Sequence, residues 1–349
     1  MHLARARLVG LGPFDDLSLS FAEDGSPPRP LSVIFGGGGV GKTTLLGAIA
    51  STRPGYAVVQ HRSRTTRQGH AMTHWHMGQD EPGRLHPLRV LSPNAQLDEP
   101  EDTALLHRRE QAAVDKRAAE GGFVLVHFPS VRWFSRTPVL LTAPERTIAR
   151  YDVRASPNTD DATRGDLARE TKQALSFASI ASALCLRDPA HPQRARLLEL
   201  DRVMRQVVTA LTGLTGYPFL GADPLTFEPL FRSPSGEAVL FDELPTGTRN
   251  LAAFGALTIR AVHAAYPEAP PHQAEAVVLI DDVGLHQETS VARQIAPALR
   301  QALPRVQWIL TTSSATVASS CETGELLALR RTPPSQRVEI YEGSEAVVH

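Results

Sequence analysis

The chain has 349 residues, of which 42% are hydrophobic and 21% charged, and its formal net charge is −1 at pH 7. These values are typical of a globular protein that buries a substantial core, and they give no general electrostatic reason to expect binding to nucleic acid or to an anionic membrane. The two widely separated cysteines, Cys185 and Cys321, exclude a disulfide framework. No apolar stretch approaches the roughly 20 residues of a membrane span, and the N-terminus lacks the apolar core of a signal peptide. We therefore expect a cytoplasmic protein without a membrane partner.

The chain opens with two candidate strands and a third that leads into a glycine run. Alternating apolar positions predict strands over 3–9 and 17–21, on either side of a turn at 10–13. The polar, proline-containing stretch 23–30 predicts a loop, and the apolar run 31–34 predicts a buried strand.

The segment "FGGGGVGKTTLL", residues 35–46, fits the phosphate-binding pattern G-x-x-x-x-G-K-[ST]. Glycine lets backbone N–H groups approach phosphate oxygens, and the helix predicted over 44–50 adds the positive end of its dipole. Lys42 supplies charge to the β- and γ-phosphates, and the Thr43 hydroxyl is placed for Mg²⁺. The residues expected to bind the nucleotide are Gly36, Gly37, Gly38, Gly39, Val40, Gly41, Lys42, Thr43 and Thr44.

Three further strands, 56–63, 71–78 and 86–93, predict an antiparallel meander. On such a strand His70, His74 and His76 share one face, which leaves two interpretations open: a zinc site or an ordinary solvent-facing strand. The neighbouring basic residues Arg62, Arg64 and Arg67 either contact phosphate or belong to a solvated loop.

The middle of the chain is expected to be mainly helical. A helix is predicted over 103–119 and a buried strand over 121–134. Arg132 comes just past the apolar part of that strand, where it either reaches the nucleotide region or residues 244–257, or forms a structural ion pair. Two further helices have clear apolar stripes and suit a helical lobe. The remaining elements expected in this region are helices near 165–186 and 194–212, a hairpin over 225–244 that turns at Ser233–Gly236, and a helix over 247–264.

The apolar run "AVVLIDD", residues 276–282, predicts a buried strand that ends in two carboxylates. At the carboxyl end of a parallel strand, Asp281 is placed to hold Mg²⁺ with Thr43, and Asp282 to orient the attacking water. Gly36 and Asp281 are 281 − 36 = 245 positions apart. This spacing predicts a large insertion between two strands of one sheet.

The C-terminal part predicts a helix over 288–302, a strand over 306–312, a short helix over 315–320 and two final strands. Together the elements predict an α/β P-loop NTPase fold with a mixed central sheet, an antiparallel β subdomain and a helical lobe.

Four segments resemble ABC-type ATPases of the RecF/SMC-like, non-transporter branch. They are the opening "LARARLVGLGPFDDLSLSF" (3–21), the signature-like "LPTGTRNLAAFGAL" (244–257), the Walker B-like "VVLIDDVGLH" (277–286) with His286, and the switch-like "VQWILTTSSATVASS" (306–320). The resemblance covers roughly residues 1–50 and 225–322. It implies one ABC-type ATPase domain over 1–349, with lobe I at about 1–150 plus 265–349 and a helical, signature-bearing lobe at about 151–264.

The resemblance also implies a homodimer with ATP at its interface. The signature helix of one subunit would direct its N-terminus, with Thr246, Gly247 and Thr248, at the γ-phosphate held by the other. At positions that matter for hydrolysis this sequence departs from the family. Pro245 replaces the signature serine, Asp282 the catalytic glutamate and Ser313 the switch histidine, while Gln60 is a candidate for the metal-sensing glutamine.

We therefore expect a Mg²⁺-dependent, slowly hydrolysing dimeric ATPase that acts as a conformational switch for a separately encoded effector, in DNA maintenance or anti-phage defence. The catalytic assignments are Asp282 and Ser313, and the metal assignments Thr43 and Asp281. Two alternatives stay open: an ATP-binding scaffold without turnover, and the nucleotide-binding subunit of a membrane transporter. Binding to nucleic acid is also left open, without support from the net charge.

Overall fold

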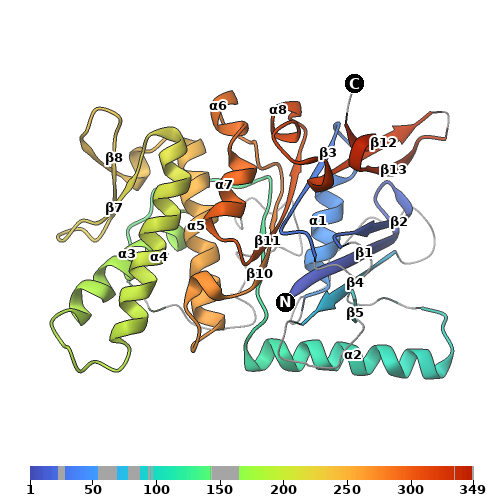
Figure 1. The fold of residues 1–349 in the computed structure, drawn as a ribbon, viewed down its shortest axis with the longest axis horizontal. Helices are drawn as coiled ribbons and strands as arrows, with labels where there is room; N and C mark the ends of the chain where they lie inside the picture. Colours follow the sequence, from blue (N-terminus) through green and yellow to red (C-terminus); the bar gives the residue numbers. More distant parts are fainter. Residues whose placement is uncertain are drawn as a thin grey trace.

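The computed structural model describes residues 1–22, 28–53, 69–77, 87–92, 95, 97–141, 143, 165–333 and 335–347, and a six-stranded mixed sheet runs through its middle (Figure 1). Five strands are parallel, and β13 at one edge is antiparallel to its neighbour. In spatial order the strands are β13 (Arg337–Glu342), β12 (Leu326–Thr332), β3 (Leu31–Gly36), β11 (Val306–Thr312), β10 (Ala276–Ile280) and β6 (Leu125–Phe128).

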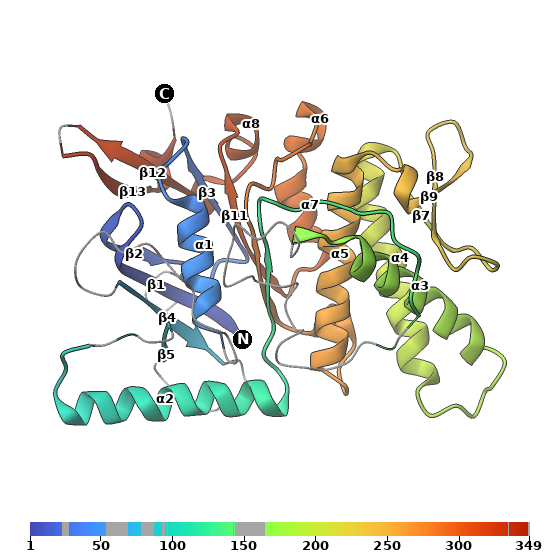
Figure 2. The ribbon, with the colours of Figure 1, turned by 180° about the vertical axis from the view of Figure 1, so that it is seen from behind.

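One face of this sheet is covered by helix α1 and by a second, antiparallel sheet. In the second sheet β1 lies between β2 and β4, and the long helix α2 packs along the outer strand β5 (Figure 2). The buried side chain of Gln307 in β11 bonds both backbone groups of Leu3 in β1 and so fixes the two sheets to each other. The elements are β1 (His2–Leu11), β2 (Phe14–Ser20), α1 (Lys42–Ser51), β4 (His70–His76), β5 (Leu88–Leu91) and α2 (Glu101–Glu120).

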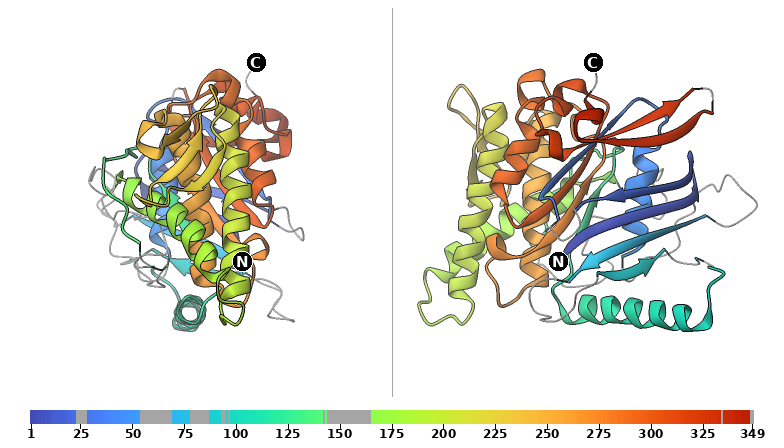
Figure 3. Two further views of the ribbon diagram at one scale, coloured as in Figure 1. Left: turned by 90° about the vertical axis from the view of Figure 1, so that its left-hand side faces the viewer. Right: turned by 45° about the vertical axis from the view of Figure 1, so that its right-hand side comes forward.

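The other face of the six-stranded sheet is covered by helices, which stand to the left of the sheet in the right-hand view of Figure 3. Helix α5 contacts β6, and α3 and α4 pack against α5 on the side away from the sheet. The elements are α3 (Ala168–Cys185), α4 (Arg194–Thr212), α5 (Thr246–Ala265), α6 (Thr289–Ala292), α7 (Ile295–Ala302) and, beyond β11, α8 (Ala315–Ala318). Among the described residues, no helix combines the length and apolarity needed to cross a membrane.

Alternation along the central strands divides the core into two hydrophobic clusters. In β10, Val278 and Ile280 belong to the cluster with α5, whereas Val277 and Leu279 belong to the cluster with α1 and β1. All five residues of β10 are buried, as expected for a parallel strand covered on both faces. Residues of both expected lobes share the first cluster, and the division into lobes stays a prediction.

Most predicted elements are present, and the mixed sheet, antiparallel subdomain and helices confirm the expected fold class. Two elements differ. The strand expected over 121–134 is only Leu125–Phe128, because Pro129 has no N–H for pairing and the chain then leaves the edge of the sheet. The helix expected over 288–302 is broken into α6 and α7, because Pro297 in a continuous helix would clash with the preceding turn but is tolerated in the first turn of α7.

The hairpin expected over 225–244 is confirmed at its turn, where Gly236 has φ +94° and its N–H bonds Ser233. It consists of β8 (Pro229–Arg232) and β9 (Ala238–Leu240), and a third strand, β7 (Phe219–Ala222), pairs with β8 without having been predicted. The expected strand 56–63 and the polar segment 155–164 lie outside the described residues.

Candidate nucleotide site

The glycine-rich loop lies between β3 and α1, at the carboxyl edge of the parallel strands. Gly41 has φ +95°, and a Cβ there would lie 2.5 Å from a Pro13 carbon and 2.6 Å from a Phe14 ring carbon, so only glycine fits. A Cβ at Gly37, Gly38 or Gly39 would meet no described atom within 4 Å. The loop is therefore fixed at its base and open at its tip, which suits close approach by a ligand.

Lys42 and Thr43 begin helix α1 and point to different partners. The Lys42 ammonium donates to the carbonyl oxygens of Gly36 and Gly37 at 2.7 and 2.8 Å. Burial lowers the pKa of Lys42, while the nearby charges of Asp281 and Asp282 act in the opposite direction. The lysine is thus held over the loop, where its charge can meet bound phosphate.

Asp281 is 1% exposed and lies directly past β10, next to α1. Its two carboxylate oxygens accept hydrogen bonds from the hydroxyl groups of Thr43 and Thr311, both at 2.6 Å. The structure thus brings together two residues that are 238 positions apart in the sequence. A carboxylate and a hydroxyl oxygen are the hard donors that Mg²⁺ prefers, so the pair fits the expected metal ligands.

Asp282 has a left-handed backbone conformation, with φ +46°. Its N–H donates to the hydroxyl of Thr311 at 2.9 Å, and its carbonyl oxygen accepts from the guanidinium of Arg132 at 2.7 Å. Left-handed φ is tolerated by aspartate better than by longer or branched residues. This conformation gives a local reason for an aspartate, rather than a glutamate, at the position.

Thr311 is the site residue that was missed from the sequence. It ends β11 beside Thr312, is fully buried, and links the Asp281 carboxylate to the backbone of Asp282. The signal was the hydroxyl-rich run "TTSS" at the end of an apolar strand. Ser313, which was assigned to catalysis, lies in the same run but is exposed.

The start of α5 faces solvent less than expected. Thr246 is half-buried and Pro245 exposed, but Gly247 and Thr248 are buried. The side chain of Gln287 donates to the Gly247 carbonyl at 3.0 Å, and a Cβ on Gly247 would lie 2.4 Å from the His286 carbonyl oxygen. The chain that follows β10 therefore packs against Gly247, while Pro245 at the same helix start stays exposed.

The other residues that the sequence suggested as binding candidates do not belong to this site. Gln60, Arg62, Arg64 and Arg67 lie outside the described residues. His70, His74 and His76 share the outer face of β4, as predicted, but within the part of the chain that the structure describes no group of three or more metal-ligating side chains is close enough to hold an ion. The interpretation as a solvent-facing strand is the one that the geometry supports.

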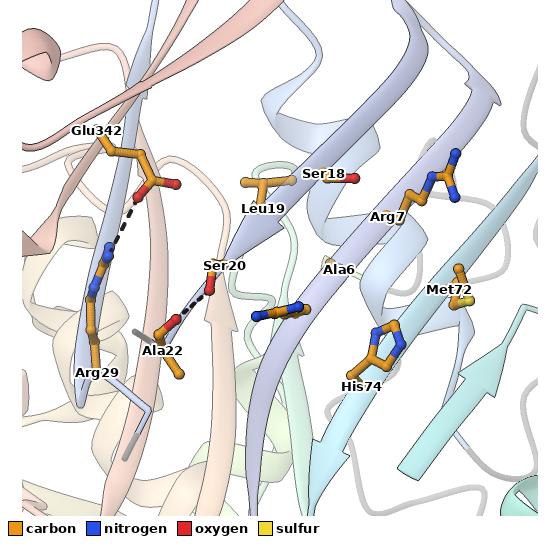
Figure 4. A pocket seen from close by; sticks show the side chains of 11 residues that line it. Ala6, Arg7, Ser18, Leu19, Ser20, Ala22, Arg29, Met72, His74 and Glu342 are labelled. Atoms are coloured by element: carbon orange, nitrogen blue, oxygen red, sulfur yellow. Dashed lines mark hydrogen bonds and ion pairs between the residues drawn. The ribbon is translucent and has the colours of Figure 1, made fainter. Parts of the chain in front are cut away.

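A hollow of about 610 Å³ lies on that outer sheet face, lined in part by Arg7, Arg29 and His74 (Figure 4). Arg7 bonds Asp16 at 2.5 Å, and Arg29 is 3.4 Å from Glu342. Burial lowers the pKa of His74 to about 4, with further lowering from the charges of two neighbouring arginines. Since these pairs balance much of the arginine charge and His74 is neutral at pH 7, we assign no ligand to the hollow.

Comparison with solved structures finds the same architecture in SMC head domains. An SMC head bound to the C-terminal winged-helix domain of ScpA is 11% identical with a TM-score of 0.53, and the match covers 99% of this chain and 98% of that one. The SMC head of Pyrococcus furiosus with an extended coiled coil, bound to the C-terminal domain of ScpA, is 11% identical with a TM-score of 0.50, over 97% and 96%. The SMC head of Thermotoga maritima is 13% identical with a TM-score of 0.48, over 98% and 99%.

At these identities the likeness shows the fold, that of a P-loop ATPase head, and not a particular branch or activity. No family model matches the sequence, and no curated protein matches it significantly.

Proposed function

We propose that the chain is an ATP-binding, Mg²⁺-dependent ATPase that hydrolyses slowly and works as a nucleotide-dependent switch. The observation that carries the proposal is the 2.6 Å hydrogen bond between Thr43, which follows the glycine loop, and Asp281, which follows β10. These are the two side chains that a P-loop ATPase needs beside each other for its metal ion.

Each residue of the site has a role in this proposal. The loop N–H groups and Lys42 bind the phosphates, Thr43 and Asp281 hold Mg²⁺, and the Asp282 carboxylate orients the attacking water. The bound Mg²⁺ would neutralise charge that develops on the phosphate oxygens. Thr311 keeps Asp281 oriented, since it donates to the carboxylate oxygen that Thr43 does not use.

Slow turnover is supported by the residues at the two positions assigned to catalysis, Asp282 and Ser313. Asp282 is one methylene shorter than glutamate, so its carboxylate reaches less far from the left-handed turn towards the attacking water. Ser313 carries no charge and cannot relay a proton as histidine does. A non-catalytic, ATP-binding scaffold is the second candidate function, and the same two residues together with Pro245 favour it.

The proposed dimer and the proposed effector protein are both suggested by the fold. Two copies would enclose ATP, with Thr246 of one copy near the γ-phosphate bound by the other, and a separately encoded effector would sense the change. Two of the similar SMC heads are bound to a domain of ScpA, which supports partner binding as a use of this fold. A role in DNA maintenance or anti-phage defence is part of the proposal as an analogy.

Calorimetry with ATP and Mg²⁺ tests the proposal directly. Lys42→Ala should weaken ATP binding by at least about 100-fold, because a charge-assisted contact contributes about 1.5–3 kcal/mol and the lysine makes more than one with bound phosphates. Lys116→Ala, in an exposed lysine on α2, is the matched control and should bind as the wild type does. Equal affinity of the wild type and Lys42→Ala would remove the basis of the assignment.

A further inference from the structure

Residues 129–141 connect β6 with the helical side of the molecule, and Arg132 in this connector is 4% exposed. Its guanidinium donates to the carbonyl oxygens of Asp281 and Asp282 at 2.6 and 2.7 Å. It also donates to the Pro129 carbonyl at 3.0 Å and to the side-chain oxygen of Asn250 in α5 at 3.2 Å. One side chain therefore bonds the carboxylate-bearing turn, its own connector and α5.

The environment of Arg132 is unusual for a buried cation. The four hydrogen bonds above all end on carbonyl or amide oxygens, and the ring of Phe254 lies 5.2 Å from the guanidinium carbon. Burial lowers the pKa of Arg132 to about 10, although the nearby charges of Asp282 and Asp281 act in the opposite direction, and the group stays charged at pH 7. A buried charge that is satisfied by neutral dipoles costs desolvation energy, and this cost is consistent with a positional role rather than one in stability alone.

The turn that Arg132 holds is strained. Asp282 has φ +46°, and residues in such conformations persist only where the surroundings determine them from several sides. Here the Thr311 hydroxyl accepts from the Asp282 N–H, and Arg132 donates to the Asp282 carbonyl oxygen. The direction of the Asp282 side chain follows from these two backbone contacts.

The outer part of the connector is fixed to the same helix start. The guanidinium of Arg249 in α5 lies 5.3 Å from the centre of the Phe134 ring. Lys172 of α3 is 1% exposed and donates both to the Thr137 carbonyl and to Asp242, the latter at 2.6 Å. Because Asp242 lies just before α5, a displacement of the α5 start would be felt along the connector and at Arg132.

We propose that Arg132 is a positioning residue that sets the orientation of Asp282 and couples it to the start of α5, so that the catalytic carboxylate is in place only when that helix start is. The inference rests on the proposed function for its catalytic consequence, but not for the coupling itself. The planar guanidinium with donors on three nitrogens is required, since a lysine keeps the charge but cannot reach four acceptors in three directions.

The test compares Arg132→Lys with Arg260→Lys, a control in α5 that alters a partly buried ion pair with Glu170. Hydrogen exchange of the backbone over 281–287, without nucleotide, should be at least about tenfold faster in Arg132→Lys and unchanged in the control. ATP affinity should stay within about threefold, while kcat should fall about 10- to 100-fold, the range expected for a misplacement of about 1 Å.

Asn250→Ala provides a second route, because it removes the acceptor of Arg132 in α5 and leaves the contacts of Arg132 to Asp281 and Asp282 in place. The Asn250 amide also donates to the Leu285 carbonyl at 3.5 Å, so Asn250→Asp, which loses that donor but keeps an acceptor for Arg132, is the control and should leave exchange over 281–287 unchanged. Asn250→Ala should raise this exchange less than Arg132→Lys does, and the double variant of Arg132→Lys and Asn250→Ala should resemble Arg132→Lys alone. The inference is overturned if exchange over 281–287 is unchanged in both Arg132→Lys and Asn250→Ala, or if Arg260→Lys raises this exchange as much as Arg132→Lys does. If Arg132→Lys does not fold, Asn250→Ala decides by the same readout. If the wild type binds no ATP, the proposed function fails while the exchange measurement still decides the coupling.

Discussion

Asp282 is the single residue on which hydrolysis would depend most. Asp282→Asn keeps the side-chain volume, tolerates left-handed φ, and leaves the backbone contacts to Thr311 and Arg132 unchanged. We expect kcat to fall about 100-fold or more, because the carboxylate that orients or deprotonates water is lost, while ATP affinity stays within about threefold. Phosphate release and calorimetry on the same preparations measure both quantities.

The hydrolysis rate of the wild type tests the roles assigned to Asp282 and Ser313. We expect a kcat well below the enzyme median of about 10 s⁻¹. Rates of tens per second without any partner would contradict the interpretation of Asp282 and Ser313, and equal slow rates in the wild type and Asp282→Asn would favour the scaffold. Asp282→Glu is not expected to be faster, because glutamate is less well tolerated in the left-handed turn.

His127 should make stability depend on pH. It is 3% exposed in β6, and burial lowers its pKa to about 4, with the charge of Arg53 lowering it further and that of Asp281 raising it. In the unfolded chain histidine titrates near 6.5, so on acidification the unfolded state binds the proton first. The free energy of unfolding should therefore fall as the pH falls from about 6.5 towards 4.

His127→Leu removes this titration at nearly constant volume. Its melting temperature should fall less than that of the wild type between pH 7 and pH 5, a window above the range in which ordinary carboxyl groups titrate. Thermal melts monitored by circular dichroism at the two pH values are sufficient. Parallel decreases in the two proteins would show that His127 does not contribute in this window.

At the scale of elements, β10 and α1 show what the local sequence pattern predicts, and the start of α5 shows what it does not. The five-residue apolar run before Asp281 predicted a buried parallel strand, and the glycine loop predicted the start of α1, because period and composition are properties of the chain itself. The burial of Gly247 could not be predicted, since it depends on Gln287 and His286, which are 40 and 39 positions away in the sequence and are brought back by the path of the chain after β10.

The candidate site divides in the same way. Lys42, Thr43, Asp281 and Asp282 follow from motifs, because the residue types and their places at strand and helix ends were sufficient. The bonds that Thr311 and Arg132 make to the turn required the fold, since β11 and the connector after β6 had to be placed beside β10. The breaks at Pro129 and Pro297 follow from proline chemistry and are readable from the sequence alone.

Phe254 is one of the α5 side chains that pack against the sheet. It is fully buried, meets Phe128 of β6 edge-on with ring centres 5.0 Å apart, and lies beneath Arg132. Phe254→Ala should lower the free energy of unfolding by about 3–5 kcal/mol, since it leaves a cavity between helix and sheet. Urea unfolding measures this, and Leu225→Ala, at an 87% exposed side chain, should change it by less than about 0.5 kcal/mol. A loss below about 1 kcal/mol for Phe254→Ala would mean that α5 is held mainly by other contacts.

At the scale of the whole molecule, the open tip of the glycine loop and the partly exposed start of α5 are the two surfaces that a dimer would bring together. Pro245 and Thr246 are the accessible residues at that start, whereas Gly247 packs against His286 within the same chain. A bulky substitution at Gly247 would therefore disturb the fold and could not test association alone. The substitution has to be made at Thr246.

ATP should drive dimerisation, and Thr246→Asp should abolish it. An acidic residue in the first turn of a helix is favourable for folding, so α5 should form normally, yet its charge would repel the γ-phosphate bound by the other copy. Each charge-assisted contact across the interface contributes about 1.5–3 kcal/mol, so the loss of one contact and the gain of a repulsion should weaken the dimer by at least about 100-fold. Light scattering with ATP, with ADP and without nucleotide measures the mass. The wild type should dimerise only with ATP, because ADP lacks the γ-phosphate, and Ser235→Asp, which adds the same charge at the exposed β8–β9 turn, should behave as the wild type. A mass that is indifferent to nucleotide, or a Thr246→Asp protein that still dimerises with ATP, would mean that this helix start does not act across an interface.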